Sequence, residues 1–182
     1  MYRDSCEQEN PHHFIFLDES GVHVGMSSRY GRAKRHQRVV SYLPFNKGQR
    51  VTLIAAIGIE EIKAALYGEW HLDGDLFLNF IQVCLLPVLK PYHVVLMDNL
   101  SAHKVAGVRT LIEATGARLV YLPPYSPDLS PIELAWSKIK GIIRKKSART
   151  YEELKEAISI AFKSIKQSDL VGWYEHCGYN VD

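Results

Sequence analysis

Cysteine is scarce in this sequence, and its few cysteines are far apart. The 182 residues include three, Cys6, Cys84 and Cys177, and no Cys-x-x-Cys pair. An odd number of distant cysteines argues against a disulfide framework or a zinc knuckle. Cys84 lies in an apolar stretch with helical spacing, where we expect it to belong to the core.

The sequence also lacks several features that would assign it to other classes. No apolar run is long enough to cross a membrane, and residues 1–11 are polar rather than signal-like. Glycine-rich nucleotide loops, the Gly-x-Ser-x-Gly elbow and the His-Glu-x-x-His motif do not occur, which argues against the enzymes built on them. We therefore expect a cytoplasmic protein that makes no contact with membranes.

Acidic residues are missing from two long stretches, residues 20–59 and 134–151. Thirteen of the 22 lysines and arginines lie there, although the net charge is only +2. A local basic patch can hold a phosphate backbone while the whole protein stays near neutral. A solvated surface is the alternative. The candidate DNA-binding residues are Arg29, Arg32, Lys34, Arg35, Arg38, Lys140, Arg144 and Lys145.

Hydrophobic periodicity predicts one α/β domain at residues 12–182, after a flexible leader at residues 1–11. Short apolar runs predict strands at residues 12–18, 50–59, 62–70, 92–98 and 118–122. A return strand at 22–26 after a turn at Gly21 is open, and a helix is the alternative for 62–70. Helical spacing predicts helices at 76–85, 103–115, 130–146 and 151–166, and a further helical turn or two within 168–176. The glycines and prolines of residues 27–50 indicate a loop or an irregular hairpin.

This order of elements favours an RNase H-like fold. We expect a five-stranded mixed sheet, with three antiparallel strands followed by two parallel ones and with helices on both faces. In that layout the first strand lies at the centre of the sheet, beside the fourth. Residues at the ends of these two strands would then be neighbours in space although they are distant in the sequence, as Asp18 and Asp98 are.

Asp18 and Asp98 each end a predicted strand. Aspartate is common where strands turn, so each residue alone has an ordinary explanation. Two carboxylates on neighbouring strand ends would repel each other unless a cation or a proton lay between them. Hard divalent cations prefer such oxygen ligands, and paired cations suit phosphodiester cleavage and transfer. The two acids therefore indicate a metal site.

A third acid, Glu133, opens the predicted helix 130–146 and has two interpretations. Ser130-Pro131-Ile132-Glu133 fits a capping box, in which the glutamate folds back onto the backbone. Alternatively, Glu133 completes the metal site. Lys140 and Arg144 follow it on the same helical stripe, where they would meet a phosphate backbone.

Three polar residues beside these acids, Glu19, Asn99 and His103, are candidate auxiliary residues. His103 would position a substrate phosphate, hydrogen-bond a carboxylate, or simply be satisfied by the backbone where a helix begins. Residues 121–125 combine tyrosine and proline, and their simplest role is to stiffen a turn. Stacking on an unpaired base is the alternative.

The segments around these residues resemble the catalytic domain of a DDE transposase of the mariner superfamily, in its bacterial insertion-sequence branch. The matching segments are Phe-Leu-Asp-Glu-Ser-Gly at 16–21, Tyr-Gly-Arg-Ala at 30–33, Asp-Asn-Leu-Ser-Ala-His-Lys at 98–104, Pro-Pro-Tyr-Ser-Pro-Asp-Leu-Ser-Pro-Ile-Glu at 123–133 with Trp136 and Lys140, and residues 172–179. The spacing between Asp98 and Glu133 is the one that this branch uses. The resemblance covers roughly residues 12–180 and departs slightly at Ser130, where the family more often has asparagine.

By this resemblance, Asp18, Asp98 and Glu133 are the catalytic triad and the metal ligands. The resemblance implies two Mg²⁺ or Mn²⁺ ions per site, cleavage of double-stranded DNA at element ends, and strand transfer into target DNA, usually at TA sites. The alternatives are a standalone metal-dependent nuclease of the same fold and an inactive remnant that binds DNA or an intact transposase.

Family members usually carry an N-terminal helix-turn-helix region that reads the element ends, whereas this sequence starts at the first catalytic strand. We expect a truncated copy or one half of a split gene. A homodimer and a separate DNA-binding chain are therefore open as partners.

Overall fold

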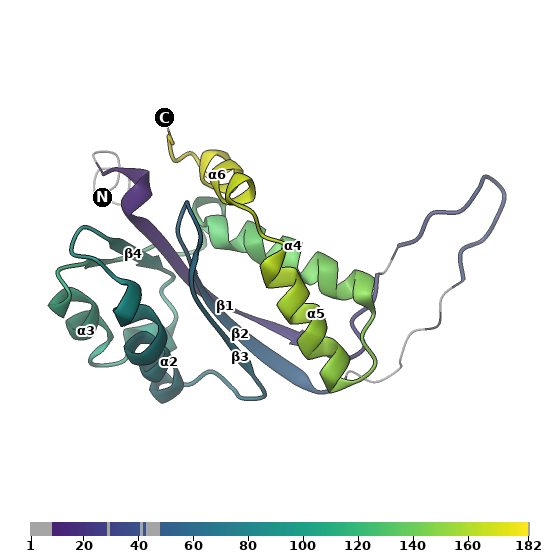
Figure 1. Cartoon of the computed structure of the whole chain (residues 1–182), viewed down its shortest axis with the longest axis horizontal. Coiled ribbons are helices and arrows are strands. Elements are labelled where there is room, and N and C mark those ends of the chain that lie inside the picture. Colours follow the sequence, from purple (N-terminus) through teal and green to yellow (C-terminus); the bar gives the residue numbers. More distant parts are fainter. Residues whose placement is uncertain (1–8, 29, 41, 43–47, 182) are drawn as a thin grey trace.

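The computed structural model of the protein describes residues 9–28, 30–40, 42 and 48–181. A five-stranded mixed sheet in the order β3-β2-β1-β4-β5 forms its centre (Figure 1). Its strands are β1 (Phe14–His23), β2 (Arg50–Ile57), β3 (Ile62–Gly68), β4 (Val94–Met97) and β5 (Arg118–Tyr121). β1, β2 and β3 pair antiparallel, and β4 is parallel to both β1 and β5. The predicted sheet, with the first strand beside the fourth, is confirmed.

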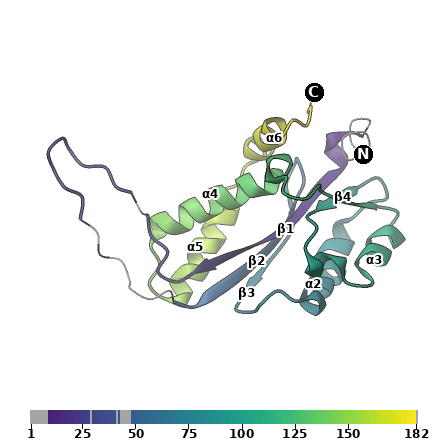
Figure 2. The ribbon, with the colours of Figure 1, turned by 180° about the vertical axis from the view of Figure 1, so that it is seen from behind.

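Helices cover both faces of this sheet, as predicted (Figures 1 and 2). They are α2 (Gly74–Phe80), α3 (Val108–Ala114), α4 (Pro131–Lys146), α5 (Tyr151–Lys163) and α6 (Gln167–His176). A π-helical turn (Ile81–Leu85) continues α2, and 3-10 turns lie at Pro11–His13, Leu86–Val88, Ser101–Lys104 and Pro127–Leu129.

Side chains alternate along β1 between the two faces of the sheet. Phe14 and Phe16 pack into the core under α4, α5 and α6, whereas Ile15 and Leu17 pack into the core under α2 and α3. All four side chains are buried. The same alternation sends the next two residues, both acidic, toward opposite faces.

The amphipathic helices of the C-terminal part form where the apolar spacing predicted them. The apolar stripe of α4 is half-buried at Ile142 and buried at Ile132, Ala135, Trp136, Ile139 and Ile143. Thr150 caps α5 within a capping box, and the buried residues of α5 are Leu154, Ala157, Ile158 and Ala161. Asp73 caps α2 by accepting from the Leu76 amide at 2.9 Å. The further turn predicted within residues 168–176 is the longer helix α6.

The predicted break in the first strand at Gly21 is wrong. β1 is continuous, because Gly21 pairs with Thr52 and Val22 pairs with Val51 on β2. The turn comes later, at Gly25, whose φ of 87° favours glycine. Residues 12 and 13, predicted as strand, belong instead to the 3-10 turn before β1. Asp18 therefore lies within a strand rather than at its end.

The predicted helix over residues 103–115 is also interrupted. A 3-10 turn at Ser101–Lys104 comes first, and α3 begins only after Gly107, which has a φ of 102°. Cys84 is half-buried rather than part of the core. Most of the expected leader, residues 1–8, lies outside the described residues, and Glu9 pairs with Arg118 at 2.6 Å.

Candidate active site

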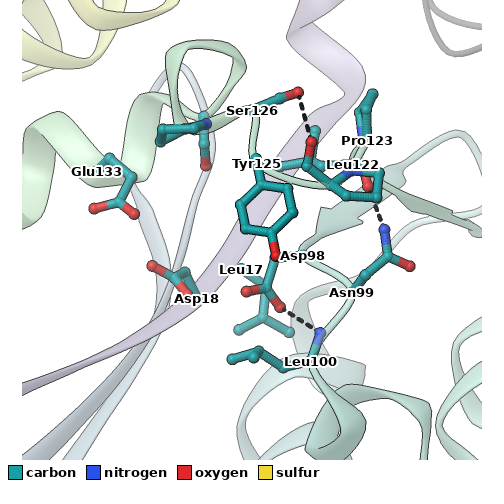
Figure 3. Close-up of a pocket in the computed structure, with 13 residues that line it drawn as sticks. Leu17, Asp18, Asp98, Asn99, Leu100, Leu122, Pro123, Tyr125, Ser126 and Glu133 are labelled. Carbon is teal, nitrogen blue, oxygen red and sulfur yellow. Dashed lines mark hydrogen bonds between the residues drawn. The ribbon is translucent and has the colours of Figure 1, made fainter.

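All three predicted catalytic acids line one cavity of about 420 Å³ (Figure 3). It lies where β1 and β4 separate, since their pairing stops at Phe16 and Leu96. Asp18 follows Phe16 and Leu17 on β1, and Asp98 directly follows β4. The rest of the lining is Leu17, Asn99, Leu100, residues 122–127 and Ser130.

Glu133 reaches this cavity from the first turn of α4. Its backbone amide donates to the Ser130 carbonyl at 3.1 Å. Within the described residues, the Ser130 side chain makes no capping hydrogen bond, so the capping-box interpretation is wrong. The Glu133 side chain is exposed, and in Figure 3 its carboxylate points toward that of Asp18.

Asp18 faces α4, where Trp136 holds it. The indole Nε1 of Trp136 donates to Asp18 Oδ2 at 2.9 Å. Burial, and then the charges of Glu19 and Glu133, raise the pKa of Asp18 to about 7, against the lowering effect of the Trp136 hydrogen bond. Burial is the largest of these causes, and the two neighbouring carboxylates add to it.

Trp136 contributes to the site in a way that sequence analysis missed, because its place in the apolar stripe of α4 explained it fully. A buried tryptophan nevertheless needs an acceptor for its N–H group. Trp136 lies about one helical turn after Glu133 along the same helix. This closeness to a candidate catalytic acid was the sequence signal that the Trp136 N–H group could reach the site.

Asp98 is held from two sides. Its Oδ1 atom accepts from the Leu100 amide at 3.0 Å and lies 2.6 Å from His103 Nδ1. This second contact is close enough for an ion pair, but the angle at His103 Nδ1 does not meet the geometry of a hydrogen bond. Burial acts to raise the pKa of Asp98, but the contacts with His103 and Leu100 outweigh it and lower that pKa.

His103 is fully buried and bridges two acids. Its Nε2 atom lies 2.8 Å from Glu19 Oε2, opposite the Asp98 contact. Burial acts to lower the pKa of His103, but the Asp98 and Glu19 carboxylates outweigh it and raise that pKa to about 9. The ring also packs on Phe77, with centroids 4.5 Å apart. A ring enclosed in this way does not contact a substrate phosphate.

The rim of the cavity is the proline-rich segment at residues 122–127. The Asn99 side chain donates to the Leu122 carbonyl and ties this segment to the end of β4. Tyr125 stands fully exposed on the rim and has a φ of 56°, a left-handed conformation that is uncommon for a bulky residue. The segment thus lines one side of the cavity and leaves the aromatic ring of Tyr125 exposed to solvent.

The donor set suits a hard cation, since three carboxylates from separate elements face one cavity. In the part of the chain that is described, however, no three His, Cys, Asp or Glu side chains are close enough to form a ready metal cluster. The predicted sharing of one cavity is observed. The closeness that sharing of cations requires is not observed among the described residues.

The candidate DNA-binding residues lie on two neighbouring surfaces. The first is the arm, defined as the described residues between β1 and β2, which extends away from the body of the molecule (Figures 1 and 2). On the arm, Arg32, Lys34, Arg35 and Arg38 are exposed, and Arg29 lies outside the described residues. The second is α4, where Arg144 and Lys145 are exposed and Lys140 is half-buried.

Two contacts join these surfaces. The Gly25 amide donates to the Ala148 carbonyl at 2.9 Å, and the Arg149 guanidinium donates to the Tyr42 carbonyl at 3.4 Å. The root of the arm therefore lies against the connection between α4 and α5. Both basic stretches meet there, although they are distant in the sequence.

The family model described as DDE superfamily endonuclease matches residues 13–155. The chain belongs to the DDE superfamily of endonucleases. A comparison with curated proteins gives no match. No helix among the described residues is long and apolar enough to span a membrane.

Solved structures of Mos1 transposase share the fold of this DDE endonuclease. The Mos1 paired-end complex with the left transposon end has a TM-score of 0.78 at 15% identity, covering 97% of this chain and 55% of that chain. The Mos1 mariner paired-end complex with Mn has a TM-score of 0.77 at 15% identity, covering 96% of this chain and 55% of that chain. The Mos1 catalytic domain has a TM-score of 0.70 at 13% identity, covering 97% of this chain and 81% of that chain. The RNase H-like fold is thus confirmed, and the chain spans about half the length of the Mos1 chains in the complexes.

Proposed function

We propose that this DDE endonuclease is the catalytic domain of a mariner-superfamily transposase from the bacterial insertion-sequence branch. It cleaves double-stranded DNA at element ends and transfers the freed 3′ end into target DNA, at TA sites. The observation that carries the proposal is the meeting of Asp18, Asp98 and Glu133 at one cavity in this fold.

Asp18, Asp98 and Glu133 would hold two divalent cations, Mg²⁺ or Mn²⁺, in the proposed reaction. Such ions, when bound, activate the attacking oxygen and stabilise the leaving oxygen of a phosphodiester. The protein's own part is to hold the carboxylates: Trp136 directs Asp18, and His103 with the Leu100 amide directs Asp98. Structures of Mos1 complexes with Mn and with Mg support this choice of ion.

The basic arm and the exposed face of α4 would hold the DNA backbone as it enters the cavity. The protein would work in the bacterial cytoplasm, where the element and target DNA lie. Because the chain spans 55% of a Mos1 chain, we propose that recognition of element ends comes from a region outside residues 12–182. A separate DNA-binding chain would supply it, and the catalytic domain would act as a homodimer.

Strand transfer with a pre-cleaved duplex tests this function, since it bypasses end recognition. With Mg²⁺ or Mn²⁺, the chain should join a free 3′ hydroxyl to plasmid DNA, and Asp18→Asn, Asp98→Asn and Glu133→Gln should each abolish joining. Glu156→Gln, a change on α5 away from the cavity lining, is the matched control and should be active. Metal-dependent nicking without joining would identify a standalone nuclease instead, and metal-independent joining would refute the assignment.

A further inference from the structure

Adjacent residues Asp18 and Glu19 face opposite sides of the sheet and make separate contacts. Asp18 meets Trp136 of α4 on one side. Glu19 meets His103 on the other side, the side of α2 and Phe77. The Glu19 side chain is 20% exposed and that of His103 is 0% exposed. Glu19 therefore lies apart from the pair formed by Asp18 and Glu133, and it is a poor candidate for a fourth ligand.

His103 is fixed by more than its two acids. Its backbone amide donates to the Leu100 carbonyl at 3.1 Å, and its carbonyl accepts from the Tyr121 hydroxyl at 3.0 Å. With Phe77 against the ring, neither its backbone nor its ring is free to turn. A carboxylate oxygen lies beside each ring nitrogen, Glu19 Oε2 at 2.8 Å from Nε2 and Asp98 Oδ1 at 2.6 Å from Nδ1.

We infer that Glu19 and His103 form a positioning pair, in which Glu19 orients the buried imidazole and the imidazole orients Asp98 as a cation ligand. This inference rests on the proposed function, because it takes Asp98 to be a ligand. The chain of contacts runs from β1 through the 3-10 turn to the end of β4. Carboxylates that bind metal are commonly held in this way by a further partner, and loss of that partner weakens metal binding.

Manganese binding to the full chain, measured by calorimetry at one pH, tests the pair without any reaction. Glu19→Gln keeps the size of the side chain but removes its charge. We expect Glu19→Gln and His103→Gln to weaken Mn²⁺ binding by about 10-fold to 100-fold. Glu61→Gln, on the connection between β2 and β3, is the matched control and should bind as the wild type does. Melting curves identify any variant that fails to fold. If His103→Gln does not fold, the result for Glu19→Gln, a change at a partly exposed residue, decides whether the inference holds.

A double-mutant cycle separates positioning from general damage to the fold. If Glu19 acts through Asp98, Glu19→Gln should have no further effect on Mn²⁺ binding once Asp98→Asn is present. Wild-type binding by Glu19→Gln, or equal losses in both backgrounds, would overturn the inference. Unchanged Mn²⁺ binding in both Asp98→Asn and Asp18→Asn would instead overturn the proposed function, so the two failures are distinguishable.

Discussion

At the scale of single residues, the pKa of Asp18 is set by burial, by two acidic neighbours and by one indole. Burial and nearby acids raise its pKa to about 7, and the Trp136 indole opposes them. A cation binds the carboxylate and not the carboxylic acid, so the proposed metal binding at this position would compete with a proton. We therefore expect metal binding to depend on pH near neutrality.

We predict that Mn²⁺ affinity rises as pH increases through about 7 and then levels off, and that binding below this pH releases about one proton per site. Trp136→Phe removes the hydrogen bond that lowers the pKa of Asp18, so the midpoint should move to higher pH. Trp173→Phe, a change on α6 away from the cavity lining, is the control and should leave the midpoint in place. Calorimetric titrations between pH 5.5 and 8.5 would contradict this reading if the Trp136→Phe midpoint moved down.

Asp18 also affects the stability of the metal-free protein, and the sign follows from its raised pKa. The folded pKa of about 7 exceeds the ordinary value of 3.8. The contribution of Asp18 to stability is therefore fully present below about pH 4 and is lost as pH rises toward 7. Asp18→Asn should be more stable than the wild type at pH 8 by roughly 1–4 kcal/mol, and this advantage should vanish near pH 4. Denaturation at the two pH values checks it, and a less stable variant at pH 8 would contradict it.

At the scale of elements, α4 has two working faces. Its apolar stripe is buried against the sheet, while Glu133 and Arg144 lie off that stripe and are exposed. The helix carries Glu133 to the cavity at its first turn and ends in three basic residues beside the root of the arm. One helix thus joins the candidate site to the basic surface.

Arg144→Ala should weaken DNA binding about equally for all sequences, because a phosphate contact carries no sequence information. The slope of log affinity against log salt should decrease by roughly one contact. Lys163→Ala, the same change of charge at the exposed end of α5, should leave both quantities unchanged. Fluorescence anisotropy on several unrelated duplexes measures this, and an effect confined to one sequence would indicate base readout.

The elements that sequence analysis predicted well are those whose apolar period alone determines them. α4 and α5 bury the stripes that their spacing marks, and β4 and β5 follow short apolar runs. The errors fall where contacts with residues distant in the sequence determine where an element begins or ends. Gly21 stays in β1 because β2 pairs along it, and Gly107 interrupts the predicted helix 103–115. Likewise, the sequence offered a hydrogen bond to a carboxylate as one of three roles for His103, but choosing this role, and finding Trp136 as the partner of Asp18, required the fold.

At the scale of the whole molecule, the described chain offers DNA an exposed arm, an exposed helix face and one acidic cavity. The candidate residues on the first two surfaces are lysines and arginines suited to phosphates. Phosphate contacts position a duplex but do not specify its sequence.

We therefore expect the chain alone to bind duplexes without preference for element ends. A competition assay between terminal-repeat and random duplexes checks this, at one stated salt concentration. Supplying an end-reading region, as a fusion or as a second chain, should then create the preference. Strong discrimination by residues 1–182 alone would show that the catalytic domain reads sequence itself.

The central place of β1 in the sheet has a consequence for how the chain folds during synthesis. β1 can pair with β2 early, but its pairing with β4 joins Phe14 to Val94, which is synthesised much later. The helices that cover Phe14 and Phe16 are made later still. A nascent chain therefore exposes an apolar sheet face until α4 and α5 emerge, and such surfaces are prone to aggregation. A product that stops before residue 131 would carry Asp18 and Asp98 yet leave that face bare, and chaperones or proteases, rather than DNA, would be its main partners in the cell.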